Sequence, residues 1–437
     1  MVLGSVLNPI NSSMLAVALI PIGRAFGAPP SQTAWLVSGL YLATAVGQPV
    51  IGRLVDAFGP RRLYLVGTAL VGVAGLVGVL APDLWVLVVS RVLLGFGTSA
   101  AYPASMSLLR TESERTGLKS PSGILATLSA SSQVISVVGP TLGGVLIGVG
   151  GWHLIFGINV PLSAACLVLG ARRLPRTPKG ERSDAGTDVP GMVLFAASLT
   201  AFMLFLMGPG LAHAYLVLIG LAAGALFVRR ERGAPAPFLD LRVLGGNGPL
   251  LATYARQLLA YTTAYVFLYG YAQWLQEGRG LGASAAGLLL LPMSLAALAV
   301  TVLTGRRPQV RGKLAVGAVL QLVGCASLLF LGADSPVWLL VLVGVVFGVP
   351  QGLNGLANQN ALYAQADPAR MGASAGLLRT FTYLGALLAA AANAAFFQDG
   401  ATTAGLHDLA WLLVAVAALF LVVSLADRSL RRVGREA

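Results

Sequence analysis

The sequence predicts an all-α membrane protein, and three observations lead to that prediction. Of its 437 residues, 56% are hydrophobic, and the mean hydropathy is +0.80. Only 10% of the residues are charged, whereas soluble domains average about 25%. The apolar residues lie in continuous runs of about 20, the length that an α-helix needs to cross a bilayer. Lipid offers no partner for backbone polar groups, so we expect these runs to be helices.

The apolar runs divide into fourteen predicted transmembrane helices. Each run is long enough to cross the hydrocarbon core as one helix. The predicted spans are 2–22, 34–54, 62–81, 84–109, 122–148, 152–171, 189–208, 211–228, 249–275, 283–304, 311–332, 336–357, 371–397 and 408–426.

The basic residues indicate how the chain is oriented in the membrane. With the N-terminus in the cytoplasm, most of the 29 Lys and Arg residues fall in cytoplasmic loops or in the C-terminal tail. This asymmetry follows the positive-inside rule, and it accounts for the net charge of +13 without a nucleic-acid partner. We therefore expect a multi-pass protein of the inner (cytoplasmic) membrane with both termini in the cytoplasm.

Composition also argues against cofactors and enzymatic chemistry. The two cysteines, Cys166 and Cys325, lie inside apolar runs, so a disulfide framework is not expected. The three histidines, His153, His213 and His407, lie in or near extracellular loops without metal-ligand spacing. The chain has no phosphate-binding G-x-x-x-x-G-K-[ST] loop and no nucleophile–base set. We expect no metal, no cofactor and no catalytic residue.

The two halves of the chain resemble each other. When the first half of the sequence is aligned with the second half so that Gly52 matches Gly305, Gly95 also matches Gly348 without a gap. Spans 1–6 and 9–14 are therefore predicted to form two similar six-helix bundles, over 1–171 and 249–437. The segment 172–248 holds cytoplasmic linkers and an inserted hairpin of spans 7 and 8. Two bundles facing each other, with a site between them, are typical of membrane transporters.

Between the second and third spans lies GRLVDAFGPRR, an unusual concentration of charge around one acid. It resembles the loop motif G-x-L-x-D-x-x-G-x-R-[RK] of the major facilitator superfamily. The matching residues are Gly52, Leu54, Asp56, Gly59, Arg61 and Arg62.

The resemblance implies that Asp56 forms a conformational latch. Its carboxylate would bond across the bundle interface only when the cytoplasmic side is closed. The expected partners are Arg110 or Arg115, and the N-terminal dipole of span 13 near Met371–Gly372. The alternative is a basic loop that sets the topology and carries a solvated Asp.

Further stretches narrow the resemblance. VSRVLLGFG (89–97) is similar to the span-4 motif of the superfamily, and VVGPTLGGVL (137–146) is similar to its antiporter motif, with Gly139, Pro140, Gly143 and Gly144. The glycines would let another helix approach closely, and Pro140 would bend the helix; ordinary helix packing is the alternative. Together with GWHLIFGINVP (151–161) and the fourteen spans, they resemble the drug:proton antiporter branch.

This branch implies a monomeric secondary transporter that exports small organic molecules by alternating access, in exchange for protons. One feature departs from its pattern, because no acid lies in the middle of a span. Asn11 stands where the branch has an Asp. Either the coupling is lost, or a rim acid such as Glu277 or Asp188 handles protons. The alternative function is a proton-uncoupled facilitator or a carrier of anionic or lipid-like substrates that uses in-span arginines.

Charges inside spans are costly and need a reason. Arg91, Arg256 and Arg379 lie inside predicted spans, where they either serve function or hydrogen-bond helix-end carbonyls.

Polar stripes of tyrosines and amides suggest a cavity for bulky, mostly apolar molecules; the alternative is that they join helices. The hairpin, with few polar residues, is expected to stay clear of the cavity. The candidate cavity residues are Asn11, Tyr41, Gln48, Arg91, Gln133, Tyr261, Tyr265, Tyr269, Gln351, Asn354, Asn358 and Arg379.

Overall fold

The computed structural model describes residues 2–28, 30–116, 122–175, 188–208, 210–235, 237–239, 241–281, 283–305, 307, 309–397, 400–431 and 433. Within these residues all regular structure is helical. The longer helices of the first half are α1 (Val2–Phe26), α2 (Pro30–Phe58), α3 (Pro60–Val79), α4 (Leu84–Thr98), α5 (Ala101–Thr116), α6 (Ser122–Gly150), α8 (Asn159–Arg173), α9 (Val189–Met207) and α10 (Ala214–Gly233). Those of the second half are α12 (Gly248–Val266), α14 (Ala283–Thr304), α15 (Val310–Ser327), α16 (Val337–Gln365), α17 (Met371–Phe396) and α18 (Thr403–Ala426).

Short helical pieces complete the chain. They are α7 (His153–Gly157), η1 (Leu211–His213), α11 (Leu241–Gly246), η2 (Phe267–Tyr271), α13 (Ala272–Glu277), η3 (Leu328–Phe330), η4 (Pro368–Arg370) and η5 (Arg428–Arg431). The segment η2 is π-helical and joins α12 to α13. Predicted span 9 is therefore one helical rod whose regular α-helix is interrupted, and predicted span 4 is divided between α4 and α5.

Eleven helices in the described part of the chain are long and apolar enough to cross a membrane, or twelve if the bent pair Leu7–Leu15 and Val17–Phe26 is one span. This number is smaller than the fourteen predicted from the sequence. Predicted spans 5 and 9 are the two outside this number: α6 is one helix over Ser122–Gly150 with some side chains outside the described residues, and span 9 is divided among α12, η2 and α13.

The helices pack in two groups. In the first, α1 packs on α6, α2 on α4, and α3 on α4 and α8. In the second, α14 and α15 pack on α16, and α17 and α18 pack on α12. Large apolar side chains such as Val149, Leu218, Leu303 and Trp411 are exposed on the outside of both groups and of the hairpin. A water-soluble protein would bury them, whereas a bilayer accepts them.

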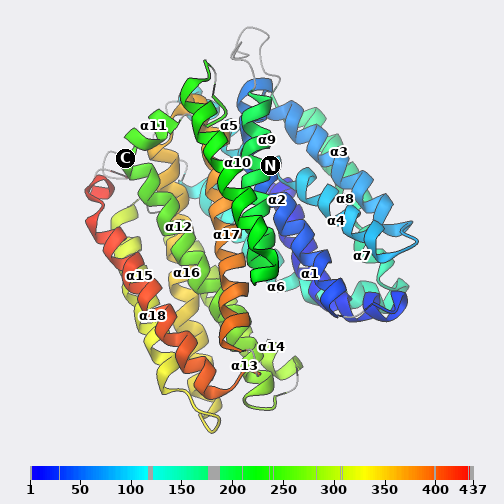
Figure 1. The fold of residues 1–437 in the computed structure, drawn as a ribbon, viewed down its shortest axis with the longest axis vertical. Coiled ribbons are helices and arrows are strands. Elements are labelled where there is room, and N and C mark those ends of the chain that lie inside the picture. The colour runs from blue at the N-terminus through cyan, green and yellow to red at the C-terminus, as the bar shows by residue number, and fades with distance from the viewer. Residues whose placement is uncertain are drawn as a thin grey trace.

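The pair α9–α10 lies across the seam between α2 of the first group and α17 of the second (Figure 1). Met203 of α9 packs against Ala45 of α2 and against Tyr383 and Leu387 of α17. The α9–α10 pair therefore touches both groups at once.

The loop between α2 and α3 forms a tight turn. Gly59 has a φ of +90°, a conformation that side chains with a Cβ rarely adopt. Pro60 then starts α3, where its missing N–H costs no hydrogen bond. The turn, which Arg61 and Arg62 follow in the sequence, joins α2 to α3 at one end of the molecule, and we term this the basic end. It is the upper end in Figure 1.

Candidate functional site

Asp56 joins the two helix groups at the basic end. Its carboxylate accepts hydrogen bonds from the backbone N–H groups of Gly372 (2.8 Å) and Ala373 (2.9 Å), in the first turn of α17. The first N–H groups of a helix have no partner within the helix, and the helix dipole favours a negative charge there. An acid of α2 thus caps a helix that begins more than 300 residues later in the chain.

Glycines let α2 and α17 approach until their backbones touch. A Cβ on Gly52 would collide with the carbonyl of Gly372, and a Cβ on Gly376 would collide with the carbonyl of Gln48. One turn further along α17, the Thr380 hydroxyl donates to the carbonyl of Ala45 over 2.7 Å. Any separation of α2 from α17 must break this whole row of contacts.

The arginines predicted around Asp56 have other partners. Arg115 forms an exposed ion pair with Glu112 (2.5 Å), and the Arg110 guanidinium lies 5.6 Å from the ring centroid of Tyr363. Arg61 donates to the carbonyl of Ala171 at the end of α8 (2.6 Å), and Arg62 is exposed. Of the partners expected for Asp56, the start of α17 is the one whose hydrogen bonds the structure records.

A second seam joins the groups between α6 and the pair α14 and α16. The Gln133 amide donates to the Thr301 hydroxyl (2.9 Å), and the Ser129 hydroxyl donates to Gln359 (3.1 Å). Gln133, a predicted cavity residue, therefore links the two groups. Both seams lie in the half of the molecule toward the basic end.

The antiporter motif lies on α6, which runs without a break from Ser122 to Gly150. A Cβ on Gly139 would collide with the Ser13 side chain, and one on Gly143 would press on Met14. Both contacts are with α1, whereas nothing lies within 4 Å of a Cβ built on Gly144. Close approach of α1 therefore explains Gly139 and Gly143 but not Gly144. The Pro140 side chain lies outside the described residues.

Asn11 and Arg91, both predicted to line the cavity, lie inside the first helix group. Asn11 is 1% exposed, and it exchanges amide hydrogen bonds with Asn159 of α8. Arg91 is fully buried, and it donates to the carbonyls of Leu36 (3.1 Å) and Asn11 (3.3 Å). These contacts correspond to the structural alternative, because they hold α1, α2, α4 and α8 together.

Arg379 lies at the interface between the groups. Its guanidinium is 4.2 Å from the ring centroid of Tyr102, which belongs to α5 of the other group. Further tyrosines lie close enough to interact electrostatically with this arginine or with one another. We term the whole set the tyrosine–arginine cluster; it consists of Tyr41, Tyr102, Tyr261, Tyr265, Tyr269, Tyr383 and Arg379.

Tyrosine ring pairs, one tilted and one stacked, build the cluster from both sides. The ring centroids of Tyr41 and Tyr383 are 5.6 Å apart, and those of Tyr265 and Tyr269 are 5.8 Å apart. The Tyr383 hydroxyl donates to Asn8 of α1 (3.3 Å). Among the described residues, no Asp or Glu forms an ion pair with Arg379. The cluster therefore combines one cation with electron-rich aromatic faces and lacks a fixed negative charge.

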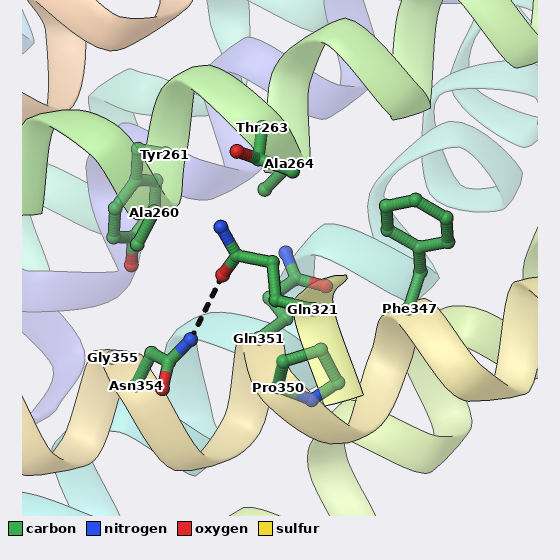
Figure 2. A pocket seen from close by; sticks show the side chains of 10 residues that line it. All are labelled: Ala260, Tyr261, Thr263, Ala264, Gln321, Phe347, Pro350, Gln351, Asn354 and Gly355. Atoms are coloured by element: carbon green, nitrogen blue, oxygen red, sulfur yellow. Dashed lines mark hydrogen bonds between the residues drawn. The ribbon is translucent and has the colours of Figure 1, made fainter. Parts of the chain in front are cut away.

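The polar stripe of α16 faces the interior of the second group. Figure 2 shows Gln351 and Asn354 beside Gln321 of α15, with Asn354 donating to Gln321 over 3.0 Å. The space between them measures about 20 Å³, enough for a water molecule. Asn358 is fully buried and donates to Gln257 (3.1 Å). These amides join helices, and the pocket beside them is too small for a bulky molecule.

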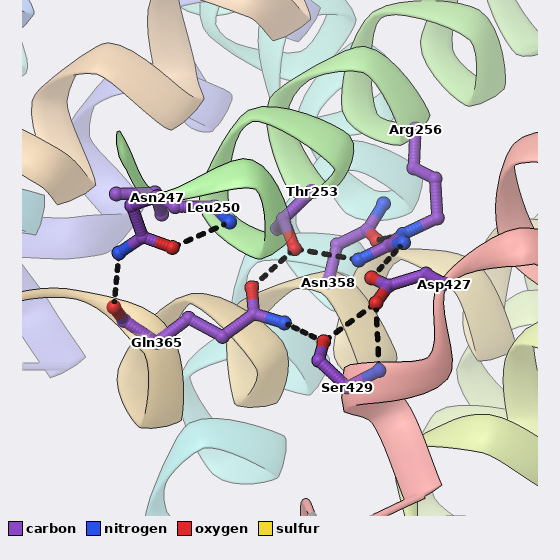
Figure 3. A network of polar contacts seen from close by, with 8 residues as sticks. All are labelled: Asn247, Leu250, Thr253, Arg256, Asn358, Gln365, Asp427 and Ser429. Atoms are coloured by element: carbon purple, nitrogen blue, oxygen red, sulfur yellow. Dashed lines mark hydrogen bonds and ion pairs between the residues drawn. The ribbon is translucent and has the colours of Figure 1, made fainter. Parts of the chain in front are cut away.

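Arg256 anchors a polar network at the basic end of the second group (Figure 3). It forms a buried ion pair with Asp427 (2.7 Å), just after α18, and also donates to Thr253 (2.6 Å). Gln365 and Ser429 continue the network and return it to Asp427. The network ties the chain beyond α18 to α12 and α16.

A cavity of about 330 Å³ lies between α2 and α17 on the side away from the basic end. Trp35 of α2, Leu387 of α17, and Met207 and His213 near the end of the α9–α10 pair help to line it. The expectation that the hairpin stays clear of the substrate cavity stays a prediction, although the end of the α9–α10 pair helps to line this space. The helices that touch at Gly52 and Gly376 are thus separated at their other ends.

Several residues that take part in these contacts escaped the sequence analysis. Tyr383 follows Arg379 by one helical turn, so helical spacing alone could have placed it in the same stripe. Asn159, Thr301 and Asp427 gave no such signal, because their partners lie more than 100 residues away. Among the described residues, no group of three or more His, Cys, Asp and Glu side chains could hold a metal ion.

Two helix groups that meet across a separable seam and enclose a polar cluster form the architecture of an alternating-access membrane transporter. The sequence profile of the Major Facilitator Superfamily matches residues 1–390. The chain belongs to this superfamily of multi-pass membrane transporters, which move small molecules and are not enzymes.

The similarity to individual proteins extends over most of the chain. This chain is 32% identical over 412 residues to the uncharacterized MFS-type transporter YwoD of Bacillus subtilis (strain 168). The aligned region covers 92% of this chain and 90% of that protein. This chain is also 31% identical over 392 residues to the lincomycin resistance protein of Streptomyces lincolnensis. That aligned region covers 86% of this chain and 79% of that protein. The crystal structure of the human organic anion transporter MFSD10 (TETRAN) shares the fold, with a TM-score of 0.68, 18% identity and coverage of 96% and 97%.

Proposed function

We propose that this chain exports small organic molecules by alternating access, as a proton antiporter of the fourteen-span branch. The supporting observation is the Asp56 contact with the start of α17, because it joins the two groups through hydrogen bonds that any opening of the basic end must break. Residues 1–171 and 249–437 act as the two moving bundles, and 172–248 contribute linkers and the inserted hairpin. The similarity to a lincomycin resistance protein supports the direction of transport.

In this proposal the basic end faces the cytoplasm, the transporter works as a monomer, and both termini are cytoplasmic. The two seams then close the cytoplasmic side, while the cavity between α2 and α17 lies on the outer side. Single cysteines introduced over 210–213 should react with membrane-impermeant reagents from outside only. Labelling from the cytoplasm would contradict both the orientation and a spanning hairpin.

The tyrosine–arginine cluster suggests which molecules are carried. Arg379 offers a guanidinium that accepts a carboxylate, sulfonate or phosphate in bidentate fashion, and it has no carboxylate partner among the described residues. The tyrosine faces stack on planar rings. We therefore infer that the cluster binds substrates that are aromatic and carry a negative or zwitterionic polar group.

Transport into proteoliposomes tests this assignment. An aromatic carboxylate dye and an aromatic cationic dye of similar size are compared for wild type, Arg379→Lys and Arg379→Ala. We expect Arg379→Ala to abolish uptake of the anion and Arg379→Lys to retain part of it. Arg311→Ala, at an exposed position of α15, is the matched control. Equal uptake of the anion by all four proteins would contradict the assignment.

The second candidate function is a proton-uncoupled facilitator or carrier of anionic or lipid-like substrates. The observation in its favour is that Asn11 is an amide committed to Asn159 and not a titratable acid. An imposed pH gradient separates the two functions: it drives substrate accumulation by the antiporter and leaves the facilitator at equal concentrations.

A further inference from the structure

Two buried carboxyl groups meet at the base of the α9–α10 pair. Asp188 is the N-cap of α9, and Glu231 lies in the last turn of α10. Asp188 is 6% exposed and Glu231 is 2% exposed. Acidic side chains are almost never buried to this extent without partners, so their surroundings require an explanation.

Each carboxyl group has one oxygen with donors. Asp188 Oδ1 accepts from Arg230 Nε (2.7 Å) and from the backbone N–H of Gly191 (3.1 Å). Glu231 Oε2 accepts from the backbone N–H of Leu239 (2.9 Å), in the segment that leads to α11 and α12. The N-cap hydrogen bond and the ion pair thus both engage Oδ1 of Asp188, and the linker residue Leu239 engages Oε2 of Glu231.

The other two oxygens, Asp188 Oδ2 and Glu231 Oε1, are buried and have no donor among the described groups. Both crowd the position that a Cβ would take on Gly191, and the two carboxyl groups lie within hydrogen-bonding reach of each other. Two carboxylates in such contact cannot both remain ionised without a large cost, and one shared proton removes that cost.

We propose that Asp188 and Glu231 form a proton-binding site, in which one proton bridges Asp188 Oδ2 and Glu231 Oε1. This inference rests on the proposed proton antiport and gives it a titratable group that the spans themselves lack. With the proton bound, Arg230 balances the charge on Asp188 and the site is neutral. When the proton leaves, two carboxylates face one guanidinium.

Among the residues that the structure describes, few other charges lie around the site. On α10, Arg229 and Arg232 flank the pair and are exposed. The side chains of α2 that reach this region, Val50 and Leu54, are apolar, and so are Met192 of α9 and Phe238 of the linker. Within the described residues, Arg230 is the cation in contact with the site, so the proton decides its net charge.

Loss of the proton would act on both helix groups. Repulsion between the carboxylates would push the end of α10 from the start of α9 and displace the segment that Glu231 holds through the N–H of Leu239. Leu239 belongs to the segment leading to α12, and α9 packs on both α2 and α17. Protonation at the hairpin therefore favours the arrangement in which the seam at Asp56 is closed.

Infrared difference spectroscopy and transport test the site in the full-length protein. The variant Glu231→Gln keeps an acceptor for Leu239 and can donate to Asp188, so it imitates the protonated state. In wild type, raising the pH should remove a C=O stretching band of a protonated carboxyl group. This band should be lost from Glu231→Gln and Asp188→Asn, and it should persist in Glu112→Gln, which alters an exposed acid that is paired with Arg115.

Transport in proteoliposomes should respond in parallel. We expect the pH dependence of wild type to be lost in Glu231→Gln and kept in Glu112→Gln. A wild-type band and pH profile in Glu231→Gln would overturn the site, and so would replacement of the proton requirement by Na⁺. If wild type transports substrate without any dependence on pH, the proton site is refuted while export itself stands. If wild type transports nothing, the proposed function fails, and the infrared band still decides whether the pair holds a proton.

Discussion

Asn11 of α1 and Asn159 of α8 exchange two amide hydrogen bonds, with N–O distances of 2.6 and 2.9 Å. The Asn11 amide also donates to the carbonyl of Leu7 (2.8 Å). Both side chains are fully enclosed by the first helix group. The amide of Asn11 thus has its donor group and its acceptor already engaged inside the first helix group.

We predict that Asn11→Asp lowers stability and does not steepen the response to a pH gradient. A carboxylate cannot donate to Asn159 or Leu7, and leaving buried groups unpaired costs about 1–3 kcal/mol. Thermal unfolding in detergent measures the first effect, and flux at matched and unmatched pH measures the second. The pair Asn11→Leu with Asn159→Leu should cost less than the two single changes added together. A new pH response in Asn11→Asp would instead favour Asn11 as the coupling position.

Asp56→Asn is expected to leave expression and folding intact and to slow transport strongly. The neutral amide presents an N–H₂ group toward the backbone donors of Gly372 or Ala373, which weakens the closed state by about 1–3 kcal/mol. Initial rates of uptake measure the effect. Glu112→Gln removes a charge at the same end without touching the seam and serves as the control. Wild-type turnover in Asp56→Asn would disprove the latch.

Adjacent glycines of the antiporter motif should differ in their tolerance of a methyl group. Gly143→Ala would press on the backbone of Met14, whereas Gly144→Ala meets open space. Gly143→Ala should therefore separate α1 from α6 and reduce both thermal stability and transport, with an overpacking cost of about 1–3 kcal/mol. Gly144→Ala should behave as wild type. If both variants lose activity equally, the motif has a role other than close packing.

The ion pair of Arg256 and Asp427 should support the fold at the basic end (Figure 3). Asp427→Leu leaves the guanidinium buried without its anion, and breaking a buried pair in this way costs about 3–5 kcal/mol. The combined change Arg256→Met with Asp427→Leu removes both charges and should recover part of that loss. Denaturation in detergent at low and high salt measures both variants. Full stability of Asp427→Leu would show that the pair contributes nothing to the fold.

Hydropathy and motif spacing predicted much of the fold, for a physical reason. A segment that must satisfy its backbone inside lipid has to be helical, so the length and position of the helices follow from the local sequence. The same local information predicted that another helix approaches the glycines of α6 closely, and the structure identifies this helix as α1 for Gly139 and Gly143. The prediction of fourteen membrane-crossing helices stays a prediction, because the described residues contain eleven or twelve helices that are long and apolar enough to span.

What the sequence by itself determined is therefore the class of protein: a helical, multi-pass chain with an internal repeat and the motifs of a transporter superfamily. The tertiary structure decided which polar side chains meet. It gave Asp56 the start of α17 as partner, enclosed Asn11 and Arg91 within one group, gathered six tyrosines and Arg379 into one cluster and brought Glu231 against Asp188. Each of these contacts depends on how a helix is rotated and on which distant helix it packs against, and neither property is fixed by the local pattern of residues.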